Sequence, residues 1–336
     1  MKDLHCLNTE SRPFVAFSFP NEDKVQVFID SGESGKEEDG FVFAPFTSDK
    51  NDALYVCPTE TYFFSREEFA SQEFGSQSLD ESDKINYEEK IRVAVEKLQT
   101  TELDKVVLSR QVGVDFGGAK SDSFKKSLSL YPSAFVYWFF HPESGHWQGA
   151  TPELFLRTKG SEIETSSLAG TRVYSPENKE EIWGEKERKE QQFVTDFIVD
   201  QLEDLTENIS QEGPKNHIAG NLVHLKTKII ARLKSGISVE RVISSLHPTP
   251  AVCGTPREPA LQTIKDLEDY DRQYYTGYLG LKNDKKTQLY VNLRCMKLYE
   301  SKAIIFVGGG ITKDSKAELE YQETQAKAMT MKKVLI

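Results

Sequence analysis

The stretch QLYVNLRCMKLYESKAIIFVGGG, residues 288–310, decides the fold class. Its two apolar runs, 288–299 and 302–307, predict a pair of strands, and the three glycines lead from the second strand into a last helix. Working outward, the apolar patterns predict strands at 14–19, 24–29, 105–114 and 134–140, and helices at 85–98, 182–205 and 222–233. Because strands and helices are interspersed without strict βαβ order, we expect a mixed α/β (α+β) fold with antiparallel sheets.

Length and composition predict one large domain over residues 1–336. The chain has 336 residues, which length alone would divide into about two domains, but it shows no internal repeat and no second composition regime. Acidic residues outnumber basic residues, 53 against 42, which argues against nucleic acid and against an anionic membrane surface as partners.

Cysteine usage and apolar run lengths predict a cytoplasmic protein. The four cysteines form no C-x-x-C pair and no Cys/His cluster with zinc spacing, which fits a reducing compartment. The longest apolar run, 134–140, falls far short of the roughly 20 residues of a membrane-spanning helix. The first residues lack the apolar core of a secretory signal.

Two predicted helices each carry a pair of glutamates on an apolar face. In the helix at 182–205, Glu187 and Glu190 lie on nearly the same side as Val194 and Phe197. Carboxylates that point inward must be paired or must coordinate a cation. The alternative is that both lie in the first turn, where glutamate favours the helix dipole and stays hydrated.

The last helix repeats this pattern with Glu320 and Glu323, which share a face with Lys327, Met331 and Val334. The alternative is a surface pair between Glu323 and Lys327, four residues apart. If the four glutamates do bind a cation, an all-oxygen ligand set favours Mg²⁺ over Zn²⁺.

Three further features could carry chemistry. Lys105 begins an apolar strand and is either a solvated strand end or a desolvated base, whereas Glu153 follows Pro152 and could be a buried general acid with a raised pKa. A mid-strand Arg294 favours a planar anion as partner. The glycines at 308–310 allow a ligand to approach the backbone closely, although such a run is more often a turn.

A series of segments, in order along 84–333, resembles the chorismate-utilising enzymes. They are KVVLSR (105–110), GATPE (149–153), SLAGTR (167–172), ERKE (187–190), HPTPAVCGTP (247–256), YTG (275–277), LR (293–294), GGGI (308–311) and EYQETQAK (320–327). The resemblance implies a chorismate-binding fold like that of anthranilate synthase component I. It also divides the chain into a catalytic region, 84–333, and a variable N-terminal portion, 1–83, that packs on the same fold.

The resemblance implies an Mg²⁺-dependent attack at C2 of chorismate with loss of the C4 hydroxyl. Lys105 would activate water, and Glu153 would protonate the departing hydroxyl. The four glutamates would bind the metal: Glu190 and Glu323 as principal ligands, and Glu187 and Glu320 directly or through water. The residues implied for substrate binding are Arg294, Tyr275, Gly309, Gly310, Lys327, His224, Ala251, Ala169, Gly170 and Thr171.

Within the family, three positions indicate the isochorismate synthases. Water-using members resemble this chain in having a lysine at Lys105, and Ala169 stands where aminodeoxychorismate synthases have a nucleophilic lysine. Ala251 resembles the alanine of isochorismate synthases. We therefore expect chorismate as substrate, no glutaminase partner and a monomer, with a product that feeds menaquinone or siderophore biosynthesis. One departure is Gln191, where most members have histidine.

Two alternatives stay open. A salicylate synthase would share the first step and then eliminate pyruvate, and either Leu168 or Tyr278 could supply the bulk that such a step needs. A catalytically inactive chorismate-fold protein would bind the ligand without turning it over.

Overall fold

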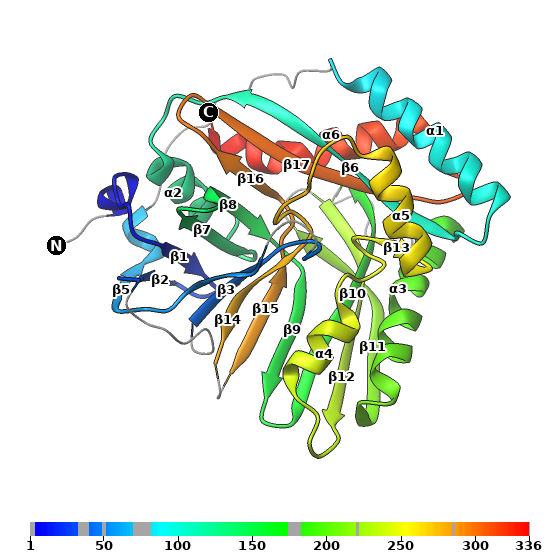
Figure 1. Cartoon of the computed structure of the whole chain (residues 1–336), viewed down its shortest axis with the longest axis horizontal. Coiled ribbons are helices and arrows are strands. Elements are labelled where there is room, and N and C mark those ends of the chain that lie inside the picture. Colours follow the sequence, from blue (N-terminus) through cyan, green and yellow to red (C-terminus); the bar gives the residue numbers. More distant parts are fainter. Residues whose placement is uncertain are drawn as a thin grey trace.

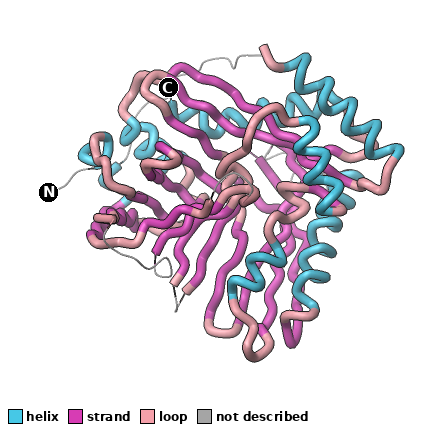
Figure 2. Tube along the Cα trace, in the orientation of Figure 1, coloured by secondary structure: helices cyan, strands magenta, loops and turns pink. Residues whose placement is uncertain are grey.

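The computed structural model describes residues 4–32, 40–48, 52–69, 82–173, 183–219, 222–283 and 286–335. These residues form two large sheets with helices packed around them (Figures 1 and 2). Every strand pair in this part of the chain is antiparallel. The expected mixed α/β fold with antiparallel sheets is therefore confirmed.

The first sheet has nine strands in the order β13-β6-β17-β16-β8-β7-β1-β2-β5. Their bounds are β1 (Phe14–Ser18), β2 (Lys24–Ile29), β5 (Glu60–Ser65), β6 (Lys105–Asp115), β7 (Phe135–His141), β8 (Gly145–Thr151), β13 (Gly254–Thr255), β16 (Cys295–Leu298) and β17 (Lys302–Ile311).

The second sheet has eight strands in the order β11-β12-β10-β9-β15-β14-β3-β4. Their bounds are β3 (Gly40–Ala44), β4 (Leu54–Val56), β9 (Leu154–Lys159), β10 (Glu162–Val173), β11 (Thr206–Ala219), β12 (Leu222–Leu233), β14 (Tyr278–Lys282) and β15 (Thr287–Val291).

The helices cover the outer faces of the sheets. They are α1 (Lys84–Thr100), α2 (Lys120–Leu130), α3 (Glu185–Glu203), α4 (Val239–Leu246), α5 (Arg257–Leu267) and α6 (Ala317–Leu335), with 3₁₀ turns η1 (Leu4–Asn8) and η2 (Arg66–Phe69). Helices α1, α5 and α6 contact β6 or β17, whereas α3 contacts β10, β11 and β12 (Figure 1). Helix α3 buries Val194 against the second sheet, as the periodicity predicted, together with Ile198 and Leu202.

An aromatic cluster joins the two sheets face to face. Phe135 of the first sheet stacks on Tyr290 of the second at 4.4 Å between ring centroids. Phe43 and Phe139 pack at the same centroid distance, also across the two sheets. Burial of such large rings is the main favourable term in folding, so this interface fixes how the sheets sit relative to each other.

Two antiparallel segments of the chain each pass from one sheet into the other. Strands β8 and β9 follow each other in the chain but belong to different sheets, and so do β15 and β16. Because β8 pairs with β16 and β9 pairs with β15, the two crossings lie side by side at 151–153 and 292–294. Each crossing contains a predicted site residue: Glu153 lies in the first and Arg294 in the second.

Two predictions of local structure were wrong. Residues 222–233 form β12 rather than a helix, because their buried side chains alternate from Val223 to Leu233, the period of a strand. The single strand expected at 288–299 is divided into β15 and β16, so Arg294 lies in the crossing and not in mid-strand. The expected start of α3 at residue 182 lies outside the described residues, and the described helix begins at Glu185.

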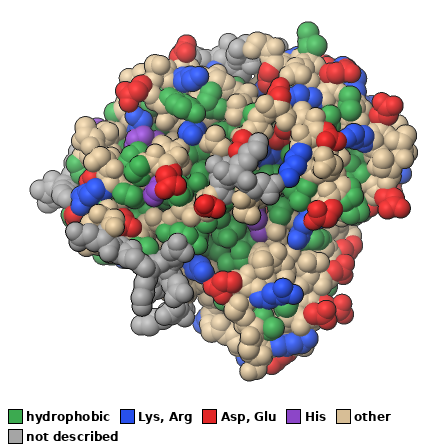
Figure 3. Space-filling view, in the orientation of Figure 1, with side chains coloured by type: hydrophobic (Ala, Val, Ile, Leu, Met, Phe, Trp, Pro, Cys, Tyr) green, Lys and Arg blue, Asp and Glu red, His purple; other side chains and the backbone are tan. Residues whose placement is uncertain are grey.

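Charged side chains of both signs are spread over the face drawn in Figure 3. Apolar side chains and a histidine lie near its centre. Among the described residues, no helix is long and apolar enough to cross a membrane.

The close approach of β14 to β3 predicts the effect of one substitution. A Cβ at Gly277 would overlap the carbonyl oxygen of Ala44 and the backbone of Pro45. We expect Gly277→Ala to lower the free energy of unfolding by about 1–3 kcal/mol or more, because rigid backbone must move. Gly117→Ala is the matched control, since its Cβ would meet nothing within 4 Å. Equal denaturant midpoints for the two variants would contradict the prediction.

Candidate active site

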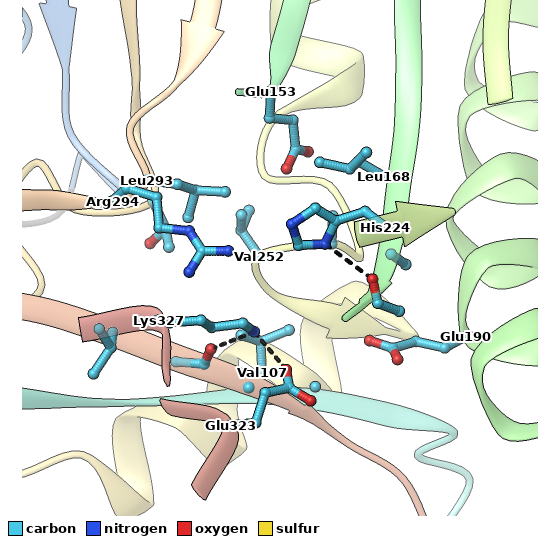
Figure 4. A pocket seen from close by; sticks show the side chains of 18 of the residues that line it. Val107, Glu153, Leu168, Glu190, His224, Val252, Leu293, Arg294, Glu323 and Lys327 are labelled. Carbon is cyan, nitrogen blue, oxygen red and sulfur yellow. Dashed lines mark hydrogen bonds and ion pairs between the residues drawn. The ribbon is translucent and has the colours of Figure 1, made fainter. Parts of the chain in front are cut away.

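A cavity opens between the ends of the two sheets, α3 and α6. The structure brings most of the predicted site residues to its wall, namely Lys105, Glu153, Ala169, Gly170, Glu190, His224, Ala251, Tyr275, Arg294, Gly309, Gly310, Glu323 and Lys327. Figure 4 shows Glu153 on one side of this cavity, with Lys327 and Glu323 across from it. Residues that are far apart in the sequence thus line one cavity, as the family resemblance implied.

Lys105 lies on the floor of the cavity, at the start of β6. Its side chain is almost fully buried, and Nζ lies 2.9 Å from Oε1 of Glu190 on α3. A Cβ at Gly310 of the neighbouring strand β17 would overlap both Glu190 Oε1 and Lys105 Cε. Glycine at 310 is therefore what allows the lysine and the glutamate to meet over the strand.

Glu153 lies in the crossing between β8 and β9, where its backbone is fixed. Its carbonyl accepts from Val291 N at 3.0 Å, and its own N–H donates to Thr151 Oγ1 at 3.3 Å. Burial raises the pKa of the Glu153 carboxyl to about 7, although the positive charge of Lys105 opposes the shift. A carboxyl with this pKa is partly protonated at neutral pH and can donate a proton.

Glu323 and Lys327 face the cavity from α6, one helical turn apart. Lys327 Nζ lies 2.6 Å from Glu323 Oε1 and also donates to the Gly308 carbonyl at 3.0 Å. The predicted pair exists, but it lies on the cavity wall and not on an open surface. The second bond ties the helix to the glycine-rich end of β17.

Arg294 provides a buried positive charge with an unsatisfied donor. Its backbone has φ of 48°, a left-handed conformation that costs energy for a residue with a Cβ. Nη1 is buried and has no hydrogen-bond partner among the described residues, and burial lowers the pKa of the guanidinium. A buried donor without a partner is costly, and an anionic ligand in the cavity would satisfy it.

His224 is neutral in this site. Burial, together with the nearby charges of Arg294 and Lys327, lowers its pKa to about 3. Nδ1 lies 3.0 Å from the carbonyl of Gly170, and a carbonyl can only accept, so Nδ1 carries the proton (Figure 4). The ring therefore presents Nε2 as an acceptor.

Three predicted site residues are not part of the cavity wall. Glu187 accepts from Arg172 Nη2 at 2.7 Å and from the N–H of Gly184 at 3.0 Å, so it caps α3. Burial alone would raise the pKa of Glu187, but these bonds hold it below its usual range. Glu320 is buried behind the wall, with Oε2 3.6 Å from the position of a Cβ on Gly309. The side chain of Thr171 lies outside the described residues.

The carboxylates that face the cavity fit a hard divalent cation. Within the described ranges, no group of three or more His, Cys, Asp and Glu side chains forms a ready cage for a metal. Glu190 and Glu323 nevertheless both line the cavity, each balanced by a lysine. Mg²⁺ is usually held by one or two carboxylates with water and substrate oxygens, so these two residues are a suitable donor set.

Sequence reasoning missed a buried ion pair beneath the cavity. Glu268 Oε2 accepts from Arg272 Nε at 2.8 Å, and Arg272 Nη1 donates to the carbonyl of Val252 at 2.9 Å. Glu268 Oε1 also accepts from the N–H of Ser109 at 2.7 Å. The spacing of Glu268 and Arg272, four residues apart, is a signal of pairing, but it did not indicate that the pair supports the cavity wall.

Comparisons with known proteins identify the family. Residues 58–336 match the family described as chorismate binding enzyme, so the chain belongs to that family. The match includes residues 58–83, which are part of the N-terminal portion that we expected to be variable.

Relatives and solved structures point in the same direction. Isochorismate synthase EntC of Escherichia coli K12 is 29% identical over 326 residues, which cover 91% of this chain and 83% of that protein. The structure of MenF, the menaquinone-specific isochorismate synthase from Escherichia coli, aligns with a TM-score of 0.84 at 20% identity, covering 100% of this chain and 92% of that one. Anthranilate synthase component I from Streptococcus pneumoniae aligns with a TM-score of 0.74 at 18% identity, covering 96% and 93%. The anthranilate synthase-like fold is therefore confirmed.

The raised pKa of Glu153 predicts how stability depends on pH. The ordinary value is 4.5 and the folded value is about 7, so the unfolded state loses its proton first as pH rises. The contribution of Glu153 to the free energy of unfolding is fully present below pH 4.5 and is lost as pH rises through 7. As pH rises from 5 to 8, the free energy of unfolding of the parent chain should therefore fall by about 2–3 kcal/mol relative to that of Glu153→Gln.

The measurement is urea unfolding at several pH values in that window. Glu143→Gln, at an exposed glutamate, is the control and should follow the parent chain. A difference between Glu153→Gln and the parent that does not change with pH would show that Glu153 keeps an ordinary pKa.

Proposed function

We propose that this chain is an isochorismate synthase, which converts chorismate to isochorismate by adding water at C2 and removing the C4 hydroxyl. The observation that carries the proposal is that Lys105 and Glu153 face one cavity, with the pKa of Glu153 raised to about 7. Membership of the chorismate binding enzymes and the similarity to EntC support the choice of substrate.

The cavity provides the charge that a dianionic substrate requires. Arg294 and Lys327 bring positive charge to the cavity of a chain whose net charge is −11. The unsatisfied Nη1 of Arg294 would donate to one carboxylate of chorismate. Tyr275 and the backbone at Gly309 and Gly310 would position the same end of the substrate.

Glu190 and Glu323 would hold Mg²⁺, with Glu320 behind them. When bound, Mg²⁺ would supply positive charge that neutralises the glutamates and the ring carboxylate of chorismate. Glu187 would act less directly, because its carboxylate is engaged by Arg172 and by the first turn of α3.

Acid and base act from separate positions on the cavity wall. Lys105 would take a proton from water as its oxygen attacks C2, and Glu153 would give a proton to the C4 hydroxyl, which leaves as water. One water enters and one leaves, so the net reaction is an isomerisation. Because Lys105 would activate water as the nucleophile, we expect no glutaminase partner. We also propose that the enzyme is monomeric and cytoplasmic.

Small residues favour release at isochorismate. Elimination of pyruvate would require the enolpyruvyl side chain to fold over the ring in a compact pose. Ala251 and Ala169 line the cavity and leave space around the ring. Leu168 also lines it, so salicylate synthase is the second candidate, whereas Tyr278 is absent from the lining and stacks on Phe155.

The first functional test is the product. With chorismate and Mg²⁺, chromatography should show a mixture of chorismate and isochorismate at equilibrium, because the two isomers differ little in bonding. EDTA should abolish turnover, added Mg²⁺ should restore it, and ammonium salts should give little aminated product. Steady salicylate fluorescence at the rate of chorismate loss would favour the second candidate, and no turnover at all would favour an inactive binding protein.

The second functional test assigns acid and base. Lys105→Ala and Glu153→Gln should each lower kcat by about 10²-fold or more, the usual scale for such groups. In the parent enzyme, kcat/KM should fall as pH rises through about 7, since Glu153 must be protonated to act. Residual activity of Glu153→Gln should lack that descending limb. Turnover close to that of the parent in either variant would overturn the assignment.

A further inference from the structure

A buried cluster of one amide and three hydroxyl groups lies directly behind Glu190. It consists of Gln191 and Thr195 on α3, Ser167 on β10 and Thr227 on β12, which we call the Gln191 cluster. The four residues are between 0% and 3% exposed. None of them belongs to the cavity wall described above.

The hydrogen bonds of the cluster converge on one atom. Nε2 of Gln191 lies 2.7 Å from Thr227 Oγ1 and 2.9 Å from both Ser167 Oγ and Thr195 Oγ1. Ser167 Oγ and Thr195 Oγ1 are 2.7 Å apart, and Thr195 Oγ1 donates to the carbonyl of Gln191 at 3.2 Å. The two amide protons thus reach hydroxyls on two neighbouring strands, which fixes the side chain in direction as well as in position.

Each element tied by the cluster also carries residues of the cavity. Glu190 precedes Gln191 on α3, Leu168, Ala169 and Gly170 follow Ser167 on β10, and His224 lies three residues before Thr227 on β12. The Gln191 cluster therefore links, by hydrogen bonds, the three elements α3, β10 and β12 that form this part of the cavity wall.

Apolar packing sets the rotation of α3 about its axis only coarsely, because the apolar face of such a helix is about 100° wide. Val194, Ile198 and Leu202 bury the helix against the second sheet, but apolar contacts are not directional. Adjacent residues on a helix point about 100° apart, so a fixed Gln191 side chain sets the direction of Glu190. In that direction Glu190 Oε1 reaches Lys105 Nζ above Gly310.

We propose that Gln191 is a positioning residue that aims the Glu190 carboxylate at the cation site. This proposal rests on the proposed function. It adds a residue that supports the metal site and that the proposed reaction alone would not identify. Gln191 touches neither substrate nor reacting atoms, so its effect should reach the reaction through Glu190. Partners that orient metal ligands commonly change metal affinity or activity 10- to 100-fold when they are removed.

The test compares two neighbouring glutamines on one helix. Gln191→Leu keeps the size of the side chain and removes the amide. Gln192→Leu is the control, because Gln192 is exposed and its amide bonds only to Asp196 among the described residues. Two Mg²⁺ midpoints are measured for the parent and both variants: the concentration for half-maximal turnover of chorismate, and that for half of the Mg²⁺-dependent rise in Tm without substrate.

We expect Gln191→Leu to raise both Mg²⁺ midpoints about 10- to 100-fold. The KM for chorismate at saturating Mg²⁺ should change little, and Gln192→Leu should match the parent. A Gln191→Leu protein that is folded, and less stable, but has the parent's midpoints would overturn the proposal, since the cluster would then only pack the helix. The absence of any Mg²⁺-dependent rise in Tm in the parent would overturn it as well.

Thr227→Val decides the matter if Gln191→Leu does not fold. It removes the shortest of the three bonds to the Gln191 amide and is expected to raise the same midpoints in the same direction. Unchanged midpoints would overturn the proposal. If the parent produces no isochorismate, the proposed function fails, but the Tm titration still tests whether Gln191 orients Glu190.

Discussion

The bend shared by two strand pairs is the constraint on which the rest of the site depends. At 151–153 and at 292–294 the chain leaves one sheet and enters the other, and strands that change sheets do so at such corners. Three hydrogen bonds hold the two corners together: Thr151 Oγ1 to the Val291 carbonyl at 2.7 Å, Val291 N to the Glu153 carbonyl at 3.0 Å, and Ala150 N to the Arg294 carbonyl at 3.0 Å. These bonds satisfy the backbone carbonyls of Val291, Glu153 and Arg294, and the side chains of Glu153 and Arg294 line the cavity.

A second constraint supports the opposite wall. The Glu268–Arg272 pair is almost fully buried, and Arg272 donates to the carbonyls of Val107 and Val252, both of which line the cavity. Losing one partner of such a pair leaves an uncompensated buried charge, which typically costs about 3–5 kcal/mol. The role of the pair is therefore structural: it holds β6 and the loop that carries Ala251 in place beneath the cavity.

Sequence patterns predicted the composition of the site better than its geometry. The phase of Glu190 relative to Val194 follows from helical periodicity, and the family motifs placed Lys105, Glu153 and Arg294 in one cavity, as the structure has them. Local pattern could not show that residues 288–299 divide between two sheets, because either half alone is a normal strand. It also favoured a helix at 222–233, where alternating burial against β10 and β11 is a tertiary effect.

Glu187 and Glu190 show why spacing alone does not assign a role. Both lie on one side of α3, as expected, yet Arg172 and the N–H of Gly184 hold the first, whereas the second reaches into the cavity. The difference arises from partners outside α3, namely Arg172 on β10 and Gly184 immediately before the helix. Gln191 points about 100° away from Glu190. Its hydrogen bonds to Ser167 and Thr227 thereby fix the direction of the Glu190 side chain. The carboxylate available for a cation is thus selected by the hydroxyl groups of the sheet behind the helix, and the same sheet carries His224 and Ala169 on the cavity wall.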